Sequence, residues 1–414
     1  MRLHHSIRTG ITAAAALAAI AGTGACLPAV ASAAAAPVRL APALDGAAKG
    51  GAVIVVMKDQ NAGLSMRAQG TMLRAADRAS QASVVSSIRA SHGTGLVRLT
   101  APDSVAATLS AAGISRLRSN PAVARIIPDP KVRVAQAVPA PGPAVRQVAA
   151  SHTWSDSQGC PFNPDPSRPL QEPEADTDIR ASDGSPGAPG MGNSIATGAG
   201  VVVANEGMDE LAGNPNFTRA DGSHVVLDAP DYTADDSNDE FYGDASSIAA
   251  QGTVDYQYSG ALPNAGIPAD CTFYIKGDAP GASLLDLSDT PYDPPVQTLA
   301  QVVSGIDQAV SENADVISES FGATYIPGSP FSQYFEAADN AAVAAGVTVV
   351  ASSGDSGDSG TVMAPSADPL VISAGAVDNF RLVAMDDGYR RYVSENMAAL
   401  SSGGTAPSGK TVDL

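Results

Sequence analysis

The sequence predicts an α/β protein: a parallel sheet with helices on both faces, preceded by a small α+β domain of the ferredoxin-like type. Apolar β-branched runs in the second half show no polar alternation, which is typical of strands buried on both faces, and amphipathic helical segments separate them. Shorter strand and helix patterns before residue 135 indicate the small domain. The Pro- and Ala-rich stretch Val134 to Arg146 lies between the two groups and is typical of an extended linker.

Composition and charge limit the classes of protein that fit this chain. It has 414 residues, 44% of them hydrophobic, which is enough for two or three domains with apolar cores. Residues 1–135 carry 15 Lys and Arg against 5 acidic residues, whereas the remainder carries 9 basic and 38 acidic residues. The strongly acidic second part argues against a nucleic acid partner.

Residues 1–36 are predicted to be a signal peptide. Arg2 and Arg8 precede the apolar run Ile11 to Val30, and Ala31-Ser32-Ala33 fits a small-residue cleavage site. No later apolar run reaches the ~18 residues that a membrane span needs. We therefore expect a secreted, extracellular protein with no membrane contact after removal of the signal.

The three cysteines are consistent with export. Cys26 would leave with the signal, so that Cys160 and Cys271 remain as a pair in an oxidising compartment. We expect a Cys160–Cys271 disulfide, and the alternative is two buried thiols.

The small domain is predicted to cover residues 50–135 in the order β, α, β, α, β. Its strands are expected at 52–57, 96–99 and 123–127, with a long helix over Arg67 to Arg89. Ser104 is expected to cap a second helix, because a hydroxyl precedes the periodic residues that follow it. This order is close to a split βαβ unit, which is able to act as a binding domain in its own right.

Residues 136–198 are predicted to be linker and irregular structure, and residues 199–414 an α/β domain in which strands and helices alternate. The predicted strands are 200–204, 273–275, 283–287, 314–318, 347–350 and 370–375, and the predicted helices are 241–252, 296–312 and 331–345. The acidic stretch 229–240 is interpreted as a solvated loop. Carboxylates also suit hard cations, so a structural calcium ion is the one cofactor that we consider there, without assigned ligands.

Polar turns follow several predicted strands. They contain Asn205 with Glu206, Ser320-Phe321-Gly322, and Ser353-Gly354-Asp355, and Asp244 opens the first predicted helix. Ligands of open parallel sheets bind at the carboxyl ends of the strands, so these turns are the candidate site. For the loop at Asp355 alone, a capped and solvated turn is the simpler interpretation.

Four segments resemble secreted subtilases of the subtilisin and sedolisin superfamily (peptidase families S8 and S53). NPAVARIIPD is similar to the end of the I9-type inhibitory propeptide, ADVISESFG to the substrate-binding strand and turn, GVTVVASSGDSG to the oxyanion turn, and SADPLVISAGAVD to the segment after it. The resemblance implies a monomeric serine endopeptidase precursor that acts on peptides or proteins and is inhibited by its own propeptide in cis. It also implies that Ser320, Phe321, Gly322, Ser353 and Gly354 bind substrate.

The catalytic positions depart from the subtilisin pattern. Asn205 stands where subtilisins have the catalytic Asp, Asp244-Ala245-Ser246 where they have His-Gly-Thr, and Asp355 where they have the oxyanion Asn. Sedolisins use Glu, Asp and an oxyanion Asp, so the resemblance implies a catalytic set of Glu206, Asp244 and Asp355. Glu240, four residues before Asp244, is the rival partner, although it is expected to precede the helix. Clustered carboxyls raise one another's pKa, so this site would favour acidic pH.

The nucleophile is missing from the expected place. In the family it lies in a Gly-Thr-Ser motif after a strand that resembles Thr411 to Leu414, and residues 401–405 match a surface turn before that strand. We therefore expect a C-terminally truncated precursor. The alternative is a catalytically inactive pseudoprotease or peptide-binding protein on the same fold.

Overall fold

The computed structural model describes most of the chain from residue 50 onward. The described residues are 50–61, 63–133, 170–172, 197–205, 211, 214–227, 239–261, 270–287, 296–322, 326, 328–357, 359–376, 398 and 400–413. All of them belong to the compact unit Val38–Leu414. The predicted signal peptide, the linker, Cys160, Glu206 and most of the acidic loop lie outside the described residues.

The N-terminal domain is an antiparallel sheet in the order β2-β3-β1-β4. Its elements are β1 (Gly51–Met57), α1 (Gly70–Ser80), α2 (Ala82–Ala90), β2 (Thr94–Leu99), β3 (Ser104–Leu109), α3 (Ala111–Arg118) and β4 (Val123–Pro128). Apart from the break between α1 and α2, this is the βαββαβ order of the ferredoxin-like fold.

One prediction for this domain was wrong. Residues Ser104–Leu109 form strand β3, which pairs with both β1 and β2, and helix α3 begins at Ala111 with Ser110 as its cap. Pairing on both sides hydrogen-bonds the backbone of this segment, and this tertiary effect outweighs its local helical pattern. The predicted helix over 67–89 is also interrupted, at Gln81, whose side-chain amide donates to the backbone oxygens of Leu99 and Ser104.

Strand β1 is apolar throughout because both of its faces are covered. Val53, Val55 and Met57 pack with α2 and α3 in the core of the N-terminal domain. Ile54 and Val56 belong instead to a core shared with α6 (Leu299–Ser311) and α7 (Pro330–Ala344) of the second domain. Successive side chains of a strand point to opposite faces, so the sheet of the N-terminal domain is a middle layer.

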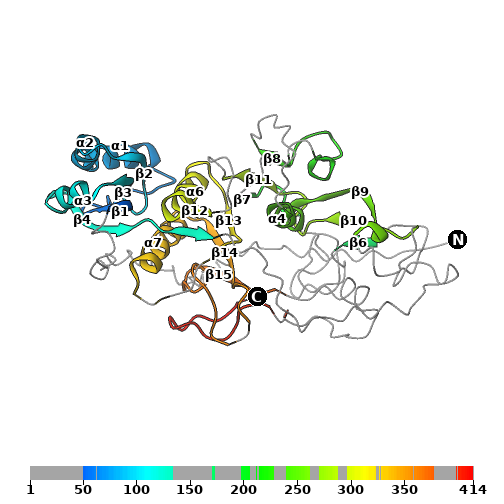
Figure 1. Cartoon of the computed structure of the whole chain (residues 1–414). Coiled ribbons are helices and arrows are strands. Elements are labelled where there is room, and N and C mark those ends of the chain that lie inside the picture. Colours follow the sequence, from blue (N-terminus) through cyan, green and yellow to red (C-terminus); the bar gives the residue numbers. More distant parts are fainter. Residues whose placement is uncertain are drawn as a thin grey trace, which may run out of the picture. The chain divides into compact units, whose positions relative to one another are not determined.

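The second domain contains a six-stranded sheet in the order β15-β14-β13-β7-β11-β8, in which every recorded pair of strands is parallel (Figure 1). The strands are β7 (Val202–Asn205), β8 (Val226–Leu227), β11 (Ser283–Asp286), β13 (Val316–Glu319), β14 (Thr348–Ser352) and β15 (Ile372–Ala374). On one face, Ala204 packs with α6 and α7; on the other, Val203 packs with α4 (Asp239–Ala249). The predicted fold class is therefore confirmed.

A separate three-stranded sheet, β6-β10-β9, was not predicted. It consists of β6 (Leu170–Glu172), β9 (Gln251–Gln257) and β10 (Thr272–Lys276), with a short helix α5 (Tyr258–Ala261) after β9. The prediction of a helix up to residue 252 was wrong, because α4 ends at Ala249. Cys271 precedes β10 and is disulfide-bonded. Its predicted partner, Cys160, lies outside the described residues, so the pairing stays a prediction.

A short antiparallel pair joins the two domains. Strand β5 (Lys131–Arg133), which follows β4, pairs with β12 (Val296–Thr298), which precedes α6. The predicted helix at 296–312 therefore starts later, at Leu299, where Thr298 and Gln301 form a capping box. Among the described residues, no helix is both long and apolar enough to cross a bilayer.

Candidate active site

The ends of three neighbouring strands place the predicted polar turns at one edge of the sheet. Strand β13 lies between β7 and β14, and Glu319 of β13 is level with Ala351 of β14. Consequently Ser320, which follows β13, and Ser353, which follows β14, leave the sheet side by side. Asn205, the last residue of β7, ends at the same edge and is buried.

Helix α4 brings Asp244 to this edge. The Ser320 hydroxyl group lies close enough to the Asp244 carboxyl group to lower its pKa. Burial raises the pKa of Asp244 above its ordinary value, and the effect of Ser320 only partly offsets this. The second carboxyl oxygen, Oδ2, is buried without a hydrogen-bond partner among the described residues. Asp244 is therefore held next to the predicted substrate turn by a contact that joins α4 to the end of β13.

Glu240 lies within α4, because this helix begins at Asp239. The expectation that Glu240 would precede the helix, with Asp244 at its first position, was wrong. Residues four apart are neighbours on one face of a helix, so Glu240 and Asp244 share a face of α4. The rival partner Glu206 lies outside the described residues.

The predicted oxyanion turn is fixed by residues that follow it by about fifty positions in the chain. The Ser353 hydroxyl group donates to the backbone oxygen of Ser402 at 2.8 Å, and the Ser402 amide donates to the backbone oxygen of Gly354 at 2.6 Å. The Ser402 hydroxyl oxygen accepts from the amide of Ser356 at 3.0 Å. Ser353 and Ser402 are therefore structural residues of the turn, and the side chain of Ser353 is occupied by these contacts.

Only glycine fits at position 354. Its φ is +104°, and a Cβ atom there would lie 2.3 Å from the sulfur atom of Met363. The next residue, Asp355, is exposed, and the partial burial of its carboxyl group raises its pKa. The turn thus presents Asp355 to solvent on a backbone that other residue types cannot adopt without strain.

The predicted substrate-binding residues divide into two kinds. Ser320 lies next to Asp244, whereas the Phe321 side chain is buried in the core and meets Phe335 edge to face at a centroid distance of 5.8 Å. A peptide bound at this edge of the sheet would meet the backbone of Phe321 and not its ring. At Gly322, a Cβ atom would lie 3.0 Å from the backbone oxygen of Ala364, so the chain also approaches closely there.

Two further carboxyl groups next to this site were missed from the sequence. Glu319 directly precedes Ser320, and Asp339 lies on α7; both are buried. Asp339 sits within the apolar stripe of α7 that Phe335, Ala338 and Ala342 form, and an acidic residue in such a stripe is the signal that was available. Within the described ranges, no group of three His, Cys, Asp or Glu side chains is arranged to hold a metal ion.

A parallel sheet with helices on both faces, and with polar turns at the carboxyl ends of its central strands, defines a subtilisin-like α/β protein. The model of the subtilase family (Peptidase_S8) matches residues 205–412, which is half of the chain, and the chain belongs to this family. No curated protein sequence matches the chain.

Several solved structures are similar to this one at low sequence identity. Fervidolysin from Fervidobacterium pennivorans, a keratinolytic enzyme related to subtilisin, is 19% identical over 87% of this chain and 46% of its own, with a TM-score of 0.46. The self-cleaved protease domain of PatA is 19% identical over 50% of this chain and 64% of its own, with a TM-score of 0.33. The prenylagaramide maturation protease PagA is 21% identical over 52% of this chain and 68% of its own, with a TM-score of 0.27. This chain thus spans about half the length of fervidolysin.

Proposed function

We propose that this chain is the precursor of a secreted subtilase-family serine endopeptidase that uses carboxyl groups where subtilisins use Asp, His and Asn. The observation that carries the proposal is the proximity of Asp244 to Ser320, which places a carboxyl group of raised pKa against the turn that would bind substrate. Catalytic groups need a pKa near the pH at which they work, and burial is a common way to reach it.

The proposed roles follow from the positions of the groups. Asp244 acts as the base that receives the proton of the nucleophile, with Glu240 or Glu206 as its partner. Asp355 donates a hydrogen bond to the oxyanion from its protonated form, which the raised pKa favours. The shared face of α4 supports Glu240 over Glu206. The serine nucleophile is not assigned to any described residue.

The N-terminal domain is proposed to be an inhibitory propeptide that acts in cis. Its last residues cover the start of α6: Asp129 Oδ1 accepts from the amide of Ala300 at 3.0 Å, and the backbone oxygen of Pro130 accepts from the amide of Leu299 at 3.0 Å. These amides belong to the first turn of a helix, which lacks partners of its own and attracts negative charge. The chain then continues as β5, paired with β12.

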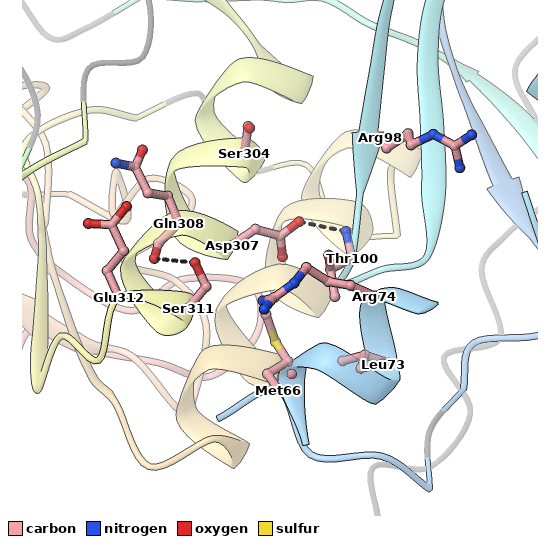
Figure 2. A pocket seen from close by; sticks show the side chains of 11 residues that line it. Met66, Leu73, Arg74, Arg98, Thr100, Ser304, Asp307, Gln308, Ser311 and Glu312 are labelled. Carbon is pink, nitrogen blue, oxygen red and sulfur yellow. Dashed lines mark hydrogen bonds between the residues drawn. The ribbon is translucent and has the colours of Figure 1, made fainter. Parts of the chain in front are cut away.

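A second set of contacts lies farther along α6. The Asp307 carboxyl group accepts from the amides of Thr100 at 2.6 Å and Ala101 at 3.2 Å, and it borders a cavity of about 290 Å³ between the two domains (Figure 2). The hydroxyl groups of Ser104 and Tyr334 are 2.6 Å apart in the same interface. This combination of polar contacts with a shared core supports a domain that stays bound to α6 and α7.

A cleavage assay with the protein expressed from its complete reading frame, so that any residues after Leu414 are included, tests the proposal. Unfolded casein is incubated with the protein between pH 3 and pH 8, and the variants Asp244→Asn and Asp255→Asn are compared. Asp255 is an exposed carboxylate of β9 and serves as the matched control. Turnover with an acidic optimum that Asp244→Asn reduces at least ~100-fold, and Asp255→Asn leaves unchanged, is the expected result. Mass spectrometry of the same samples should find self-cleavage between residues 134 and 146.

The alternative function is peptide binding without cleavage. The buried amide nitrogen Nδ2 of Asn205, which has no partner among the described residues, favours it, because an amide there cannot take the part of a catalytic carboxylate. Saturable binding of a casein-derived peptide without turnover at any pH, weakened by Asp244→Asn, would support this function. Absence of both turnover and binding would contradict both proposals.

A further inference from the structure

The side chain of Met363 lies between the predicted substrate turn and the predicted oxyanion turn. A Cβ atom built on Gly354 would overlap the sulfur atom of Met363 and lie 2.8 Å from its Cγ atom. A Cβ atom built on Gly322 would lie 3.2 Å from the Cε methyl group of the same side chain. Because neither glycine has a side chain, the thioether packs against the backbone of both turns. Met363 is therefore the contact that the two turns share.

The backbone of Met363 is fixed by hydrogen bonds on both sides of its Cα atom. Its amide donates to the backbone oxygen of Ser353 at 3.1 Å, and its own backbone oxygen accepts from the amide of Ala367 at 2.7 Å. Ser353 follows the last residue of β14 and precedes Gly354, so the first of these bonds ties Met363 to the oxyanion turn. An unbranched, flexible thioether fills an irregular gap of this kind well.

Met363 differs from other described methionines in its access to solvent. Met57 is 2% exposed, within the core of the N-terminal domain, and Met72 on α1 is 60% exposed. Met363 is half-buried. The susceptibility of methionine to oxidation follows the exposure of its sulfur atom, so a small water-soluble oxidant should reach Met72 first, then Met363, and Met57 last.

We propose that Met363 is an oxidation site through which hydrogen peroxide loosens the two turns. The sulfur atom donates an electron pair to one oxygen atom of the peroxide. A sulfur–oxygen bond forms while the oxygen–oxygen bond breaks, and the products are methionine sulfoxide and water. The sulfur atom loses two electrons and the peroxide gains them. A methionine sulfoxide reductase reverses the change: two thiols become a disulfide, and the oxygen atom leaves as water.

The added oxygen atom does not fit the contact that the sulfur atom makes. Oxidation converts a flexible apolar side chain into a polar one with a fixed geometry at sulfur. The sulfur atom already touches the backbone of Gly354, and the hydroxyl oxygen of Ser402 crowds the same glycine, at 3.0 Å from a Cβ atom built there. Movement of Gly354 would disturb the hydrogen bonds between Ser402 and this turn. Oxidation therefore displaces the Met363 side chain or the turn, and either change separates the two turns.

As a modification site, Met363 stands on these contacts and on its exposure. Its effect on substrate rests on the function proposed above, because the turns that it joins are those predicted to bind the peptide and the oxyanion. Met363 acts through Gly322 and Gly354, so it is a positioning residue. Oxidation should weaken the action of the site on peptides, and reduction of the sulfoxide should restore it.

Peroxide treatment of the full chain tests the site without an activity assay. The wild type, Met363→Leu and Met72→Leu are treated with dilute hydrogen peroxide, and mass spectrometry measures both the sulfoxide at each methionine and the hydrogen exchange of the amides. Leucine has a similar volume and no sulfur atom, so Met363→Leu keeps the packing and cannot be oxidised there. Met72→Leu is the matched control, because it removes an exposed methionine from another part of the molecule.

The amides of Ser356, Gly357 and Met363 report the state of the oxyanion turn, since each is hydrogen-bonded in the reduced protein. We expect their protection from exchange to fall roughly tenfold on oxidation of the wild type and of Met72→Leu, and to stay unchanged in Met363→Leu. Treatment of the oxidised wild type with a methionine sulfoxide reductase should restore the protection.

The proposal is overturned if Met363 stays reduced after Met72 is fully oxidised, or if treated Met363→Leu loses protection as the wild type does. Should Met363→Leu fail to fold, a time course on the wild type makes the same test. The loss of protection then has to follow the sulfoxide at Met363 and not that at any other methionine. Neither result depends on turnover. An inactive protein with the expected exchange contradicts only the proposed function, and an active protein without it contradicts only the oxidation site.

Discussion

Carboxyl groups are half-buried in one region of this molecule and fully buried in another, and their surroundings differ. Between the two domains, Asp307 and Asp129 accept hydrogen bonds from backbone amides. Next to the predicted substrate turn, Glu319 and Asp339 are buried, and the charges of Asp368 and Glu336 act together with burial to raise the pKa of Asp339. Amide donors favour the ionised form of a carboxyl group, whereas a neighbouring carboxyl group favours the protonated form. Burial raises the pKa of the carboxyl groups in both regions, and in the first region the backbone amides oppose that rise.

The largest effect is expected from Asp339→Ala. It removes a fully buried side chain and leaves a cavity in the core, which should lower the free energy of unfolding by about 3 kcal/mol. Asp339→Asn should change the free energy of unfolding little at pH 5, and at pH 8 the variant should be more stable than the wild type. Thermal or urea unfolding at the two pH values measures both variants. If Asp339→Ala and Asp339→Asn lowered the free energy of unfolding equally at both pH values, the distinction between the two regions would be removed.

The same conservative change should have the opposite result between the domains. Asp307→Asn replaces one of two acceptor oxygens by a donor, so one of the amides of Thr100 and Ala101 loses its partner. We expect Asp307→Asn to lower the free energy of unfolding by about 2 kcal/mol at pH 5, a pH at which Asp339→Asn has little effect on stability. Hydrogen exchange at residues 99–102 of the full chain reports the loss. Unchanged protection there would mean that these amide contacts do not hold the domains together.

Domain contact should also weaken as pH rises. Burial raises the pKa of Asp307 to about 7, although the amides of Thr100 and Ala101 oppose the shift. An exposed Asp has a pKa near 4, so the contact is strongest below that value and weakens as pH rises through about 7. Between pH 6 and pH 8 we expect roughly tenfold faster corrected exchange at residues 99–102. The cavity next to Asp307 gives water access and reduces the effect. Exchange that slows with rising pH would show that the ionised form dominates.

The smallest effect is expected at Ser402, where no charge is involved. Ser402→Ala removes the hydroxyl acceptor of the Ser356 amide but keeps both backbone hydrogen bonds of Ser402. We expect urea unfolding to show that the free energy of unfolding falls by about 1 kcal/mol, and by the same amount at pH 5 and pH 8. A pH-dependent loss would imply that Asp355, in the same turn, is coupled to this hydroxyl group.

Much of the fold was predictable because strong local patterns coincide with tertiary roles. The apolar runs of β7, β13 and β14 are buried on both faces, and the stripe of α6 faces the sheet. The secondary-structure predictions failed where pairing with neighbouring strands decides the conformation. Ser104–Leu109 has a helical pattern and is a strand because β1 and β2 lie on either side of it. Residues after Ala249 form β9 because β10 pairs with them.

For the candidate site, the sequence by itself determined which residue types are present and that three polar turns follow neighbouring strands. Parallel strands bring their carboxyl ends to one edge, so this conclusion needs no coordinates. Only the tertiary structure decided that Ser320 lies next to Asp244, that α4 starts early enough to contain Glu240, and that the ring of Phe321 points into the core. It also decided that Asp339 is fully buried near the charges of Asp368 and Glu336. The physical reason is that the protonation state and role of a carboxyl group depend on the donors and charges around it, and folding brings these from distant parts of the chain.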